Sequence, residues 1–207
     1  MSTIKIAVLG AGHIGGTLGS KWVAAGHQVV FGVNNPNGEN ARKLRGELGD
    51  RATIGTIAEA LATNPDVVVL AIPGAAMNGT IEQYAQQLDG KIIIDTANKM
   101  GSNTHNSFAA LQQHAPNARI YRAFNTLGWE NFANPIFEGT SADLFYCGTD
   151  GESRATVEQL ISDIGLQPIY LGGVEQVGVV DSLLGLWFAL AISQGKGRNL
   201  AFKVLTR

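Results

Sequence analysis

Short apolar runs alternate with helix-like segments along most of the chain, and this alternation restricts the folds that the chain can adopt. The apolar runs, which we expect to form strands, are Ile4–Leu9, Gln28–Val33, Thr53–Ile54, Asp66–Ile72, Lys91–Asp95, Ala118–Phe124, Asp143–Cys147 and Gln167–Leu171. The expected helices are Ile14–Ala25, Asn40–Leu48, Ile57–Ala62, Ala76–Leu88, Ser107–His114 and Ser153–Ile164. Strands separated by helices imply right-handed crossovers and a mainly parallel sheet. The sequence therefore predicts a doubly wound α/β fold.

The run Asp66–Ile72 is the clearest strand in the sequence, because valines and a leucine follow one another until Pro73 ends it. We expect this strand in the middle of the sheet. Charged residues make up only 15% of the 207 residues, which favours a sheet covered by helices on both faces.

The strand pattern ends near Gly172, where a long apolar helix follows. We expect a dinucleotide-binding domain over residues 1–172 and a small helical extension over residues 173–207 that serves the substrate cleft and a dimer contact. The stretch Val174–Ser193 contains Glu175 and Asp181, and its uncharged part, from Ser182 to Gly195, is shorter than the roughly 20 apolar residues of a membrane span. An interface or core helix is the expected structure, with no membrane contact.

Net charge and cysteine content narrow the classes of partner. The formal net charge of -2 leaves no basic excess for binding nucleic acid. The single cysteine, Cys147, cannot form an internal disulfide and lies in an expected strand, which predicts a buried, inert thiol. The apolar run that begins at Ile4 leaves no room for an export signal. We expect a cytoplasmic protein.

A glycine-rich turn follows the first expected strand directly. Its residues are Gly10, Ala11, Gly12, His13, Ile14 and Gly15, which match G-x-G-x-x-G between a strand and a helix. In this motif the first glycine permits a tight turn, the second lets the backbone approach a pyrophosphate, and the third allows close helix packing. Free N–H groups at the helix start would face the anion. The motif predicts a dinucleotide site, although a glycine turn without a ligand has the same sequence.

The residues after the second strand bear on the choice between NAD and NADP. An acidic residue there would bind the ribose 2′-hydroxyl, whereas this chain has Asn34 and Asn35. Their amides can donate to phosphate oxygens, and Arg42 or Lys43 could add positive charge. This pattern favours NADP, although for Arg42 or Lys43 taken singly a solvated helix face is the more ordinary role.

Three further strand ends converge on the nicotinamide region in such a fold. They place Ile72 and Pro73 against the ring or ribose, and the amides of Asn98 and Asn125 near the carboxamide or substrate. Asparagine at a strand end is also a common turn former, so both roles stay open for Asn98 and Asn125.

No side chain is a persuasive proton donor for a ketone or alcohol substrate. None of the tyrosines has a lysine four residues on, and the histidines show no metal-ligand spacing, so we expect no metal site. Lys196, with Asn199 three residues on, and His105 are the alternatives, although the glycine-rich turn around Lys196 is more typical of a surface or capping role. A flavin-type acceptor takes hydride onto its own ring and needs mainly stacking and the exclusion of water. Trp129, Met77, Leu127 and Trp187 are candidate walls of such a cleft, although a core or interface position is the more ordinary role for each of them.

Several segments in matching order resemble one family. They are the glycine turn 10–15, Ala71–Pro73, Ile94–Asn98, Ala123–Gly128, Phe145–Gly148 and Gly197–Phe202. Together they resemble the NADP-dependent oxidoreductases of 8-hydroxy-5-deazaflavin, coenzyme F420, and the reductase domain of membrane metalloreductases.

The resemblance implies a Rossmann fold, hydride exchange between NADP(H) and the deazaflavin, and a homodimer joined through C-terminal helices. It also implies that residues 10–15 hold the pyrophosphate, that Asn34 and Asn35 face the 2′-phosphate, and that Pro73, Asn98 and Asn125 border the nicotinamide. Many relatives carry a basic pair where this chain has the two asparagines, which weakens the phosphate contact. Lys99, Arg119 and Arg122 are candidate contacts for the acidic tail of the deazaflavin.

The leading hypothesis is an oxidoreductase that transfers hydride between NADP(H) and a deazaflavin or flavin acceptor. A second hypothesis is NADPH-dependent reduction of a small carbonyl or imine compound through Lys196 or His105. A third is a non-catalytic NADP(H) sensor that recruits a protein through the apolar C-terminal helix.

Overall fold

The computed structural model describes residues 2–102 and 104–207, and they form two compact units, one ending at Ile120 and the other running from Tyr121 to Arg207. We call them unit 1 and unit 2. The predicted seam at Gly172 does not coincide with this division. The reason is that the helix after Gly172 packs against a strand of unit 2, so residues 173–207 share its core.

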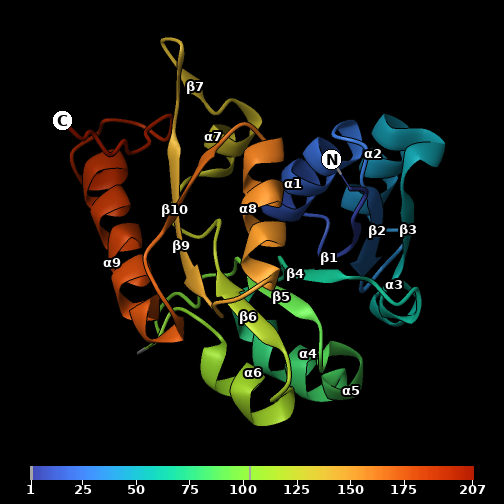
Figure 1. Ribbon diagram of the computed structural model, residues 1–207. Coiled ribbons are helices and arrows are strands. Elements are labelled where there is room, and N and C mark those ends of the chain that lie inside the picture. The colour runs from blue at the N-terminus through green and yellow to red at the C-terminus, as the bar shows by residue number, and fades with distance from the viewer. Residues whose placement is uncertain (1, 103) are drawn as a thin grey trace. The chain divides into compact units, whose positions relative to one another are not determined.

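Unit 1 contains a parallel sheet with strands in the order β5-β4-β1-β2-β3 (Figure 1). The strands are β1 (Lys5–Leu9), β2 (Gln28–Val33), β3 (Thr53–Thr56), β4 (Val67–Leu70) and β5 (Ile92–Asp95), and each neighbouring pair is parallel. All four residues of β4 are completely buried, with β1 on one side and β5 on the other. The prediction of a parallel sheet with an interior strand at this position is confirmed.

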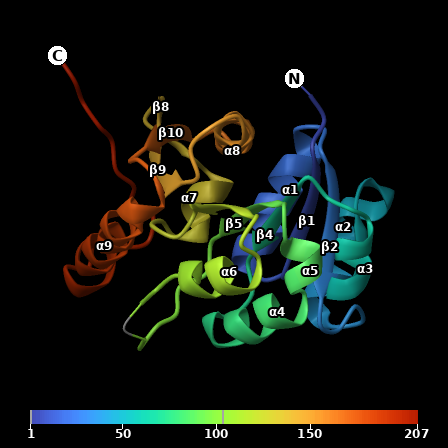
Figure 2. The same cartoon turned by 60° about the horizontal axis from the view of Figure 1, so that its bottom comes forward.

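The helices of unit 1 are α1 (His13–Ala24), α2 (Glu39–Leu48), α3 (Ile57–Ala62), α4 (Met77–Gln83), α5 (Ala85–Leu88) and α6 (Phe108–His114), with short 3₁₀ turns η1 (Gly49–Arg51) and η2 (Gly74–Ala76). The expected helix Ala76–Leu88 is divided at Tyr84, whose φ of -110° and ψ of 23° are not helical. The two resulting helices, α4 and α5, lie next to each other (Figure 2).

Helices cover both faces of the unit 1 sheet, as two adjacent residues of β2 demonstrate. A Cβ atom on Gly19 of α1 would lie 2.3 Å from the ring of Phe31, so this side chain packs under α1. A Cβ atom on the next residue, Gly32, would lie 3.0 Å from Ala60 and from Ile57 of α3. Since successive strand residues point to opposite faces, α1 and α3 cover different faces.

Helix α3 begins with a reciprocal cap. The Thr56 hydroxyl accepts from the Glu59 backbone N–H at 3.2 Å, and the Glu59 carboxylate accepts from the Thr56 backbone N–H at 2.7 Å. The hydrogen bonds from the backbone and then the hydroxyl of Thr56 lower the pKa of Glu59. The cap therefore favours the ionised carboxylate in the folded state.

Replacing Glu59 with glutamine should lower the stability of the protein at neutral pH, because glutamine keeps the cap but not the charge. Because the pKa of Glu59 is lower in the folded state, the ionised carboxylate stabilises the protein at pH values above the unfolded pKa of about 4.3. This stabilisation is lost as the pH falls through the folded pKa. The unfolding midpoints of the wild type and E59Q should therefore converge below pH ~4. Thermal unfolding of both proteins between neutral and acidic pH measures these midpoints. A difference between the two midpoints that does not depend on pH would contradict the prediction.

Unit 2 contains β9 (Asp143–Gly148) between two strands. It pairs with β10 (Gln167–Tyr170) in parallel and with β6 (Arg119–Arg122), whose last two residues belong to this unit, in antiparallel. A two-residue hairpin joins β7 (Ile136–Phe137) and β8 (Thr140–Ser141). This hairpin and α7 (Trp129–Ala133) occupy a stretch in which the sequence shows no periodicity.

The other helices of unit 2 are α8 (Ser153–Asp163), the 3₁₀ turn η3 (Val174–Gln176), α9 (Val177–Phe188) and the π-helical turn η4 (Ala189–Ser193). The helical C-terminal end is confirmed, and α9 is drawn in orange-red in Figure 1. Among the described residues, Val174–Ser193 is the one helix long and apolar enough to cross a membrane, by length and composition alone. Its mean hydropathy is 1.6 and 22% of it is buried, so much of its apolar surface is not covered by the chain itself.

Candidate functional site

The glycine turn after β1 is shaped by close contacts inside unit 1. Gly10 has a φ of +114°, and a Cβ atom there would lie 2.3 Å from the Ala71 carbonyl oxygen. A Cβ atom on Gly15 would lie 2.3 Å from the Gly10 carbonyl oxygen. Glycine is required at both positions, because any side chain would collide with backbone atoms.

Gly12 differs from its two neighbours in the motif, because a Cβ atom there would meet no atom within 4 Å. Gly12 is the N-cap of the 12-residue helix α1, and no side chain caps that helix. The helix N-terminus therefore presents backbone N–H groups beside open space, an arrangement that suits an anion. The protein does not need a glycine here for packing, which fits a close approach by a ligand.

A pocket of about 630 Å³ lies at this position in unit 1. This volume is typical of a pocket for a small molecule or cofactor. Nine of the predicted cofactor-binding residues line it, namely Gly10, Ala11, Gly12, His13, Ile14, Asn34, Asn35, Ile72 and Pro73. Gly15 supports the turn from behind. The tertiary structure thus brings together the ends of three strands, β1, β2 and β4, the first and last of which lie about sixty residues apart in the sequence.

The two asparagines after β2 differ in structure. Asn35 forms a turn of its own, since its Oδ1 accepts from the Asn37 backbone N–H at 3.0 Å and its carbonyl oxygen accepts from Gly38. Its Nδ2 group is then the side-chain atom left to donate. Asn34 is exposed at the pocket edge. Both can offer amide donors to a ribose substituent.

The charged residues around this pocket differ from the prediction. Arg42 and Lys43 are exposed on α2 and are not among the residues that line the pocket, and Lys43 lies 3.9 Å from Glu47. Glu39, the first residue of α2, lines the pocket instead. Sequence reasoning missed Glu39 because it began the helix one residue later. An acidic residue between Gly38 and the helix was the signal that could have found it.

A buried carboxylate organises the turn after β5. Asp95 is completely buried, and its two oxygens accept from the backbone N–H groups of Ala97 at 3.1 Å and Ser107 at 2.7 Å. The turn leads to Asn98, which is half-buried. A Cβ atom on Gly74 would lie 2.8 Å from the Asn98 carbonyl oxygen, so the Pro73–Gly74 segment and Asn98 are neighbours within unit 1.

Met77 and Lys99 take structural positions in unit 1. Met77, a predicted wall of the substrate cleft, is completely buried at the start of α4 and packs in the core. Lys99 Nζ donates to Asn78 Oδ1 at 2.8 Å. Arg119 donates to the Gly90 carbonyl oxygen at the beginning of β6.

Asn125 is held in unit 2 by a buried ion pair. Its Nδ2 donates to Asp181 Oδ1 at 3.3 Å, and the same oxygen accepts from Arg122 Nε at 2.8 Å. Arg122 is completely buried, so its predicted role as an exposed contact for an acidic ligand tail is wrong. The preceding residue of the turn, Phe124, has a φ of +61°, a conformation that is rare for an aromatic residue and common at functional sites.

Asn125 is only 2% exposed, whereas Trp129 is half-buried at the start of α7. Trp187 and Leu127, also predicted as cleft walls, are buried in unit 2, and Trp187 donates through Nε1 to the Leu200 carbonyl oxygen at 2.9 Å. Among these aromatic and apolar candidates, Trp129 keeps the most accessible position.

Cys147 and Tyr146 are poor acid or base groups. Burial, reinforced by the charge of Asp181, raises the pKa of the Cys147 thiol to about 12, which agrees with the inert thiol expected from the sequence. Burial and a hydrogen bond to Glu158 raise the pKa of Tyr146 above its usual range. Each group stays protonated at neutral pH.

Lys196 and His105 occupy very different surroundings. Lys196 is exposed in the turn that follows the C-terminal helix. His105 is half-buried in the loop before α6, and its Nδ1 atom is buried without a hydrogen-bond partner. Among the described residues, no three His, Cys, Asp or Glu side chains gather as a metal site would require.

The parallel sheet, the glycine turn and the pocket define a Rossmann-type α/β protein. Residues 5–99 match the family described as NADP oxidoreductase, coenzyme F420-dependent. The resemblance inferred from the sequence is confirmed over this part of the chain.

Two solved structures are similar to the whole chain. A protein from Arthrobacter sp. FB24, provisionally described as an F420-dependent NADP-reductase, has 26% identity and a TM-score of 0.85, and the match covers 98% of this chain and 100% of that one. A reductive aminase from Aspergillus terreus in complex with NADPH4 has 19% identity and a TM-score of 0.66, covering 94% and 64% of the two chains. The second likeness shows a shared fold only.

Two curated proteins are also similar. A glycerol-3-phosphate dehydrogenase [NAD(P)+] of Ectopseudomonas mendocina is 25% identical over 98% of this chain, and the metalloreductase STEAP3 of Rattus norvegicus is 24% identical over 86% of it. The chain spans 62% of the first relative's length and 36% of the second's.

Proposed function

We propose that this protein is an NADPH-linked oxidoreductase that passes hydride to a flat, flavin-like acceptor, with the deazaflavin coenzyme F420 as the first candidate. The observation that carries the proposal is the open space before Gly12 at the uncapped start of α1, within a pocket large enough for part of a dinucleotide. Backbone N–H groups in this position bind a pyrophosphate without any cationic side chain. The family match over residues 5–99 supports the same cofactor.

In this proposal the bound NADPH supplies the hydride, and the protein binds and orients it. Residues 10–14 hold the pyrophosphate, and Asn34 and Asn35 contact the adenosine ribose. Asp95 fixes the turn that carries Asn98, and Asp181 fixes the amide of Asn125. On the resemblance, Pro73 and Asn98 of unit 1 border the nicotinamide.

A planar ring acceptor is favoured over a ketone because a ketone requires a positioned proton donor. Lys196 is exposed in a turn, and the hydroxyl of Tyr146 is engaged with Glu158. A flavin or deazaflavin accepts the hydride on its ring and takes its proton from solvent, so the protein needs only to stack the two rings and exclude water. The description of the Arthrobacter protein supports the deazaflavin.

Purified protein should oxidise NADPH when F420, FMN, FAD and a ferric chelate are supplied one at a time, with F420 the fastest. Stopped-flow absorbance of the reduced nicotinamide measures each rate. Turnover of a cyclic imine or ketone alone would favour the second hypothesis from the sequence. Tight NADPH binding without turnover of any acceptor would favour the sensor.

We also propose that a second copy of this chain covers the apolar face of the C-terminal helix. Val179, Leu186 and Ile192 are 51%, 46% and 53% exposed, although each is a large apolar residue. Exposed apolar patches on a helix commonly mark a protein interface. Light scattering that finds only a monomer at micromolar concentration would contradict this assembly.

A further inference from the structure

The ribose end of the pocket contains an acidic side chain and lacks a basic one. Among the described residues that line it, six form the edge after β2, and Glu39 is the only one of the six that carries a charge; they are Asn34, Asn35, Gly38, Glu39, Asn40 and Ala41. In dinucleotide-binding folds, this edge contacts the adenosine ribose.

The position of Glu39 directs its carboxylate toward this edge. Glu39 is the first residue of α2, and its N-cap, Gly38, has no side chain to cap the helix. Side chains on a helix lean toward the N-terminus, which here is the end that lines the pocket. The carboxylate therefore occupies the positive, N-terminal end of the α2 dipole. Without Glu39, the same end of the helix would stabilise the 2′-phosphate of NADP.

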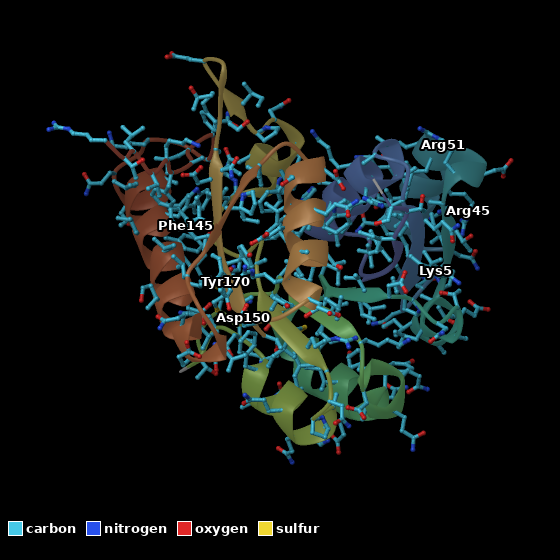
Figure 3. The ribbon with its side chains drawn as sticks, viewed as in Figure 1. Lys5, Arg45, Arg51, Phe145, Asp150 and Tyr170 are labelled. Carbon is cyan, nitrogen blue, oxygen red and sulfur yellow. The ribbon has the colours of Figure 1, made fainter. Side chains whose placement is uncertain are left out.

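The basic residues of α2 are engaged elsewhere or lie away from the pocket. Lys43 lies 3.9 Å from Glu47, and Arg45, labelled in Figure 3, donates to the Pro36 carbonyl oxygen at 3.2 Å. Neither of them nor Arg42 lines the pocket. A 2′-phosphate bound here would thus meet three neutral side-chain amides and one carboxylate of like charge.

We propose that Glu39 sets the cofactor preference of this protein. Its carboxylate accepts a hydrogen bond from the 2′-hydroxyl of NAD(H) and repels the 2′-phosphate of NADP(H). The protein therefore binds both dinucleotides and discriminates only weakly between them. This inference rests on the proposed function, because it concerns the same dinucleotide pocket.

The test compares the dissociation constants of NADPH and NADH, measured by calorimetry, for the wild type, Glu39→Gln and Glu47→Gln. The control variant, E47Q, removes the same charge from the same helix outside the pocket. E39Q should shift the ratio of the two constants toward NADPH on the order of tenfold, as expected for like charges a few ångströms apart at an exposed site. E47Q should leave the ratio unchanged, and high salt should shrink the shift in E39Q.

An unchanged ratio of the two dissociation constants in E39Q would overturn the inference, because Glu39 would then have no effect on cofactor preference. An equal shift in E39Q and E47Q would also overturn it, because the shift would then follow from net charge and not from the position of Glu39. If neither dinucleotide binds to the wild type, the proposed function itself fails, and this result is distinct from either ratio. Because Glu39 is exposed at a helix start, E39Q should fold, and its circular dichroism confirms this before binding is measured.

Discussion

Replacing Asp181 with alanine should destabilise unit 2 by about 3–5 kcal/mol, because it leaves the charge of Arg122 buried without its ion-pair partner. The guanidinium donates to Asp181 at 2.8 Å, and the side chains of Arg122 and Asp181 are 0% and 10% exposed. The contact joins β6 to α9, which are separated by more than fifty residues. The same change frees the Asn125 amide from the oxygen that orients it.

A surface pair in the same unit provides the control. Asp150 contacts Arg154 at 3.0 Å at the beginning of α8, but its side chain is 72% exposed. Asp150, labelled in Figure 3, lies near Tyr170, whose ring is covered by the Arg154 guanidinium. Asp150→Ala should cost at most about 1 kcal/mol, as exposed ion pairs do. Chemical denaturation of both variants measures the difference. Equal losses in D181A and D150A would show that the buried pair has no special role.

Replacing Gly12 with alanine should weaken dinucleotide binding by about 10- to 100-fold while leaving the fold intact, since forcing an extra methyl group into a filled space costs about 1–3 kcal/mol and each ~1.4 kcal/mol is tenfold in affinity. The backbone of Gly12, with φ of -75° and ψ of -169°, suits any residue, and a Cβ atom there touches nothing in the protein. The methyl group would instead occupy the space beside the N–H groups of α1 that the pyrophosphate requires.

Two other glycines separate binding from folding. Gly15→Ala places a Cβ atom 2.3 Å from the Gly10 carbonyl oxygen and should lower the unfolding temperature. Gly46→Ala meets no atom within 4 Å on α2 and should affect neither property adversely, since alanine favours helices. Calorimetry with NADPH and thermal unfolding distinguish the three variants. Undiminished binding by G12A would remove the main support for the proposed function.

Local patterns in the sequence were sufficient for the sheet and the glycine turn. The apolar run that becomes β4 is short, β-branched and ended by a proline, which leaves few structures besides an interior strand. Gly10 and Gly15 are required by backbone contacts that any strand-turn-helix unit of this type makes. Nine of the predicted cofactor-binding residues line one pocket for this reason.

Roles that depend on distant partners could not be predicted in this way. Arg122 looks like an exposed cation in the sequence, but Asp181, 59 residues on, makes it part of the core. For Met77 the sequence left a core position and a cleft wall both open, and the tertiary structure buries its side chain completely at the start of α4. The unit boundary could not be predicted for the same reason, because α9 packs against β9, which ends nearly thirty residues earlier in the chain.

The sequence by itself determined the alternation of strands and helices, the direction of the sheet and the position of the glycine turn, because these follow from periodicity and from glycine's lack of a side chain. Only the tertiary structure decided which charged residues are buried, which are paired and which line the pocket. Glu39 enters the pocket and Arg42 does not because the start of α2 lines it and the exposed face of that helix does not. Burial and charge pairing are properties of the folded surroundings, and contacts between distant segments create them.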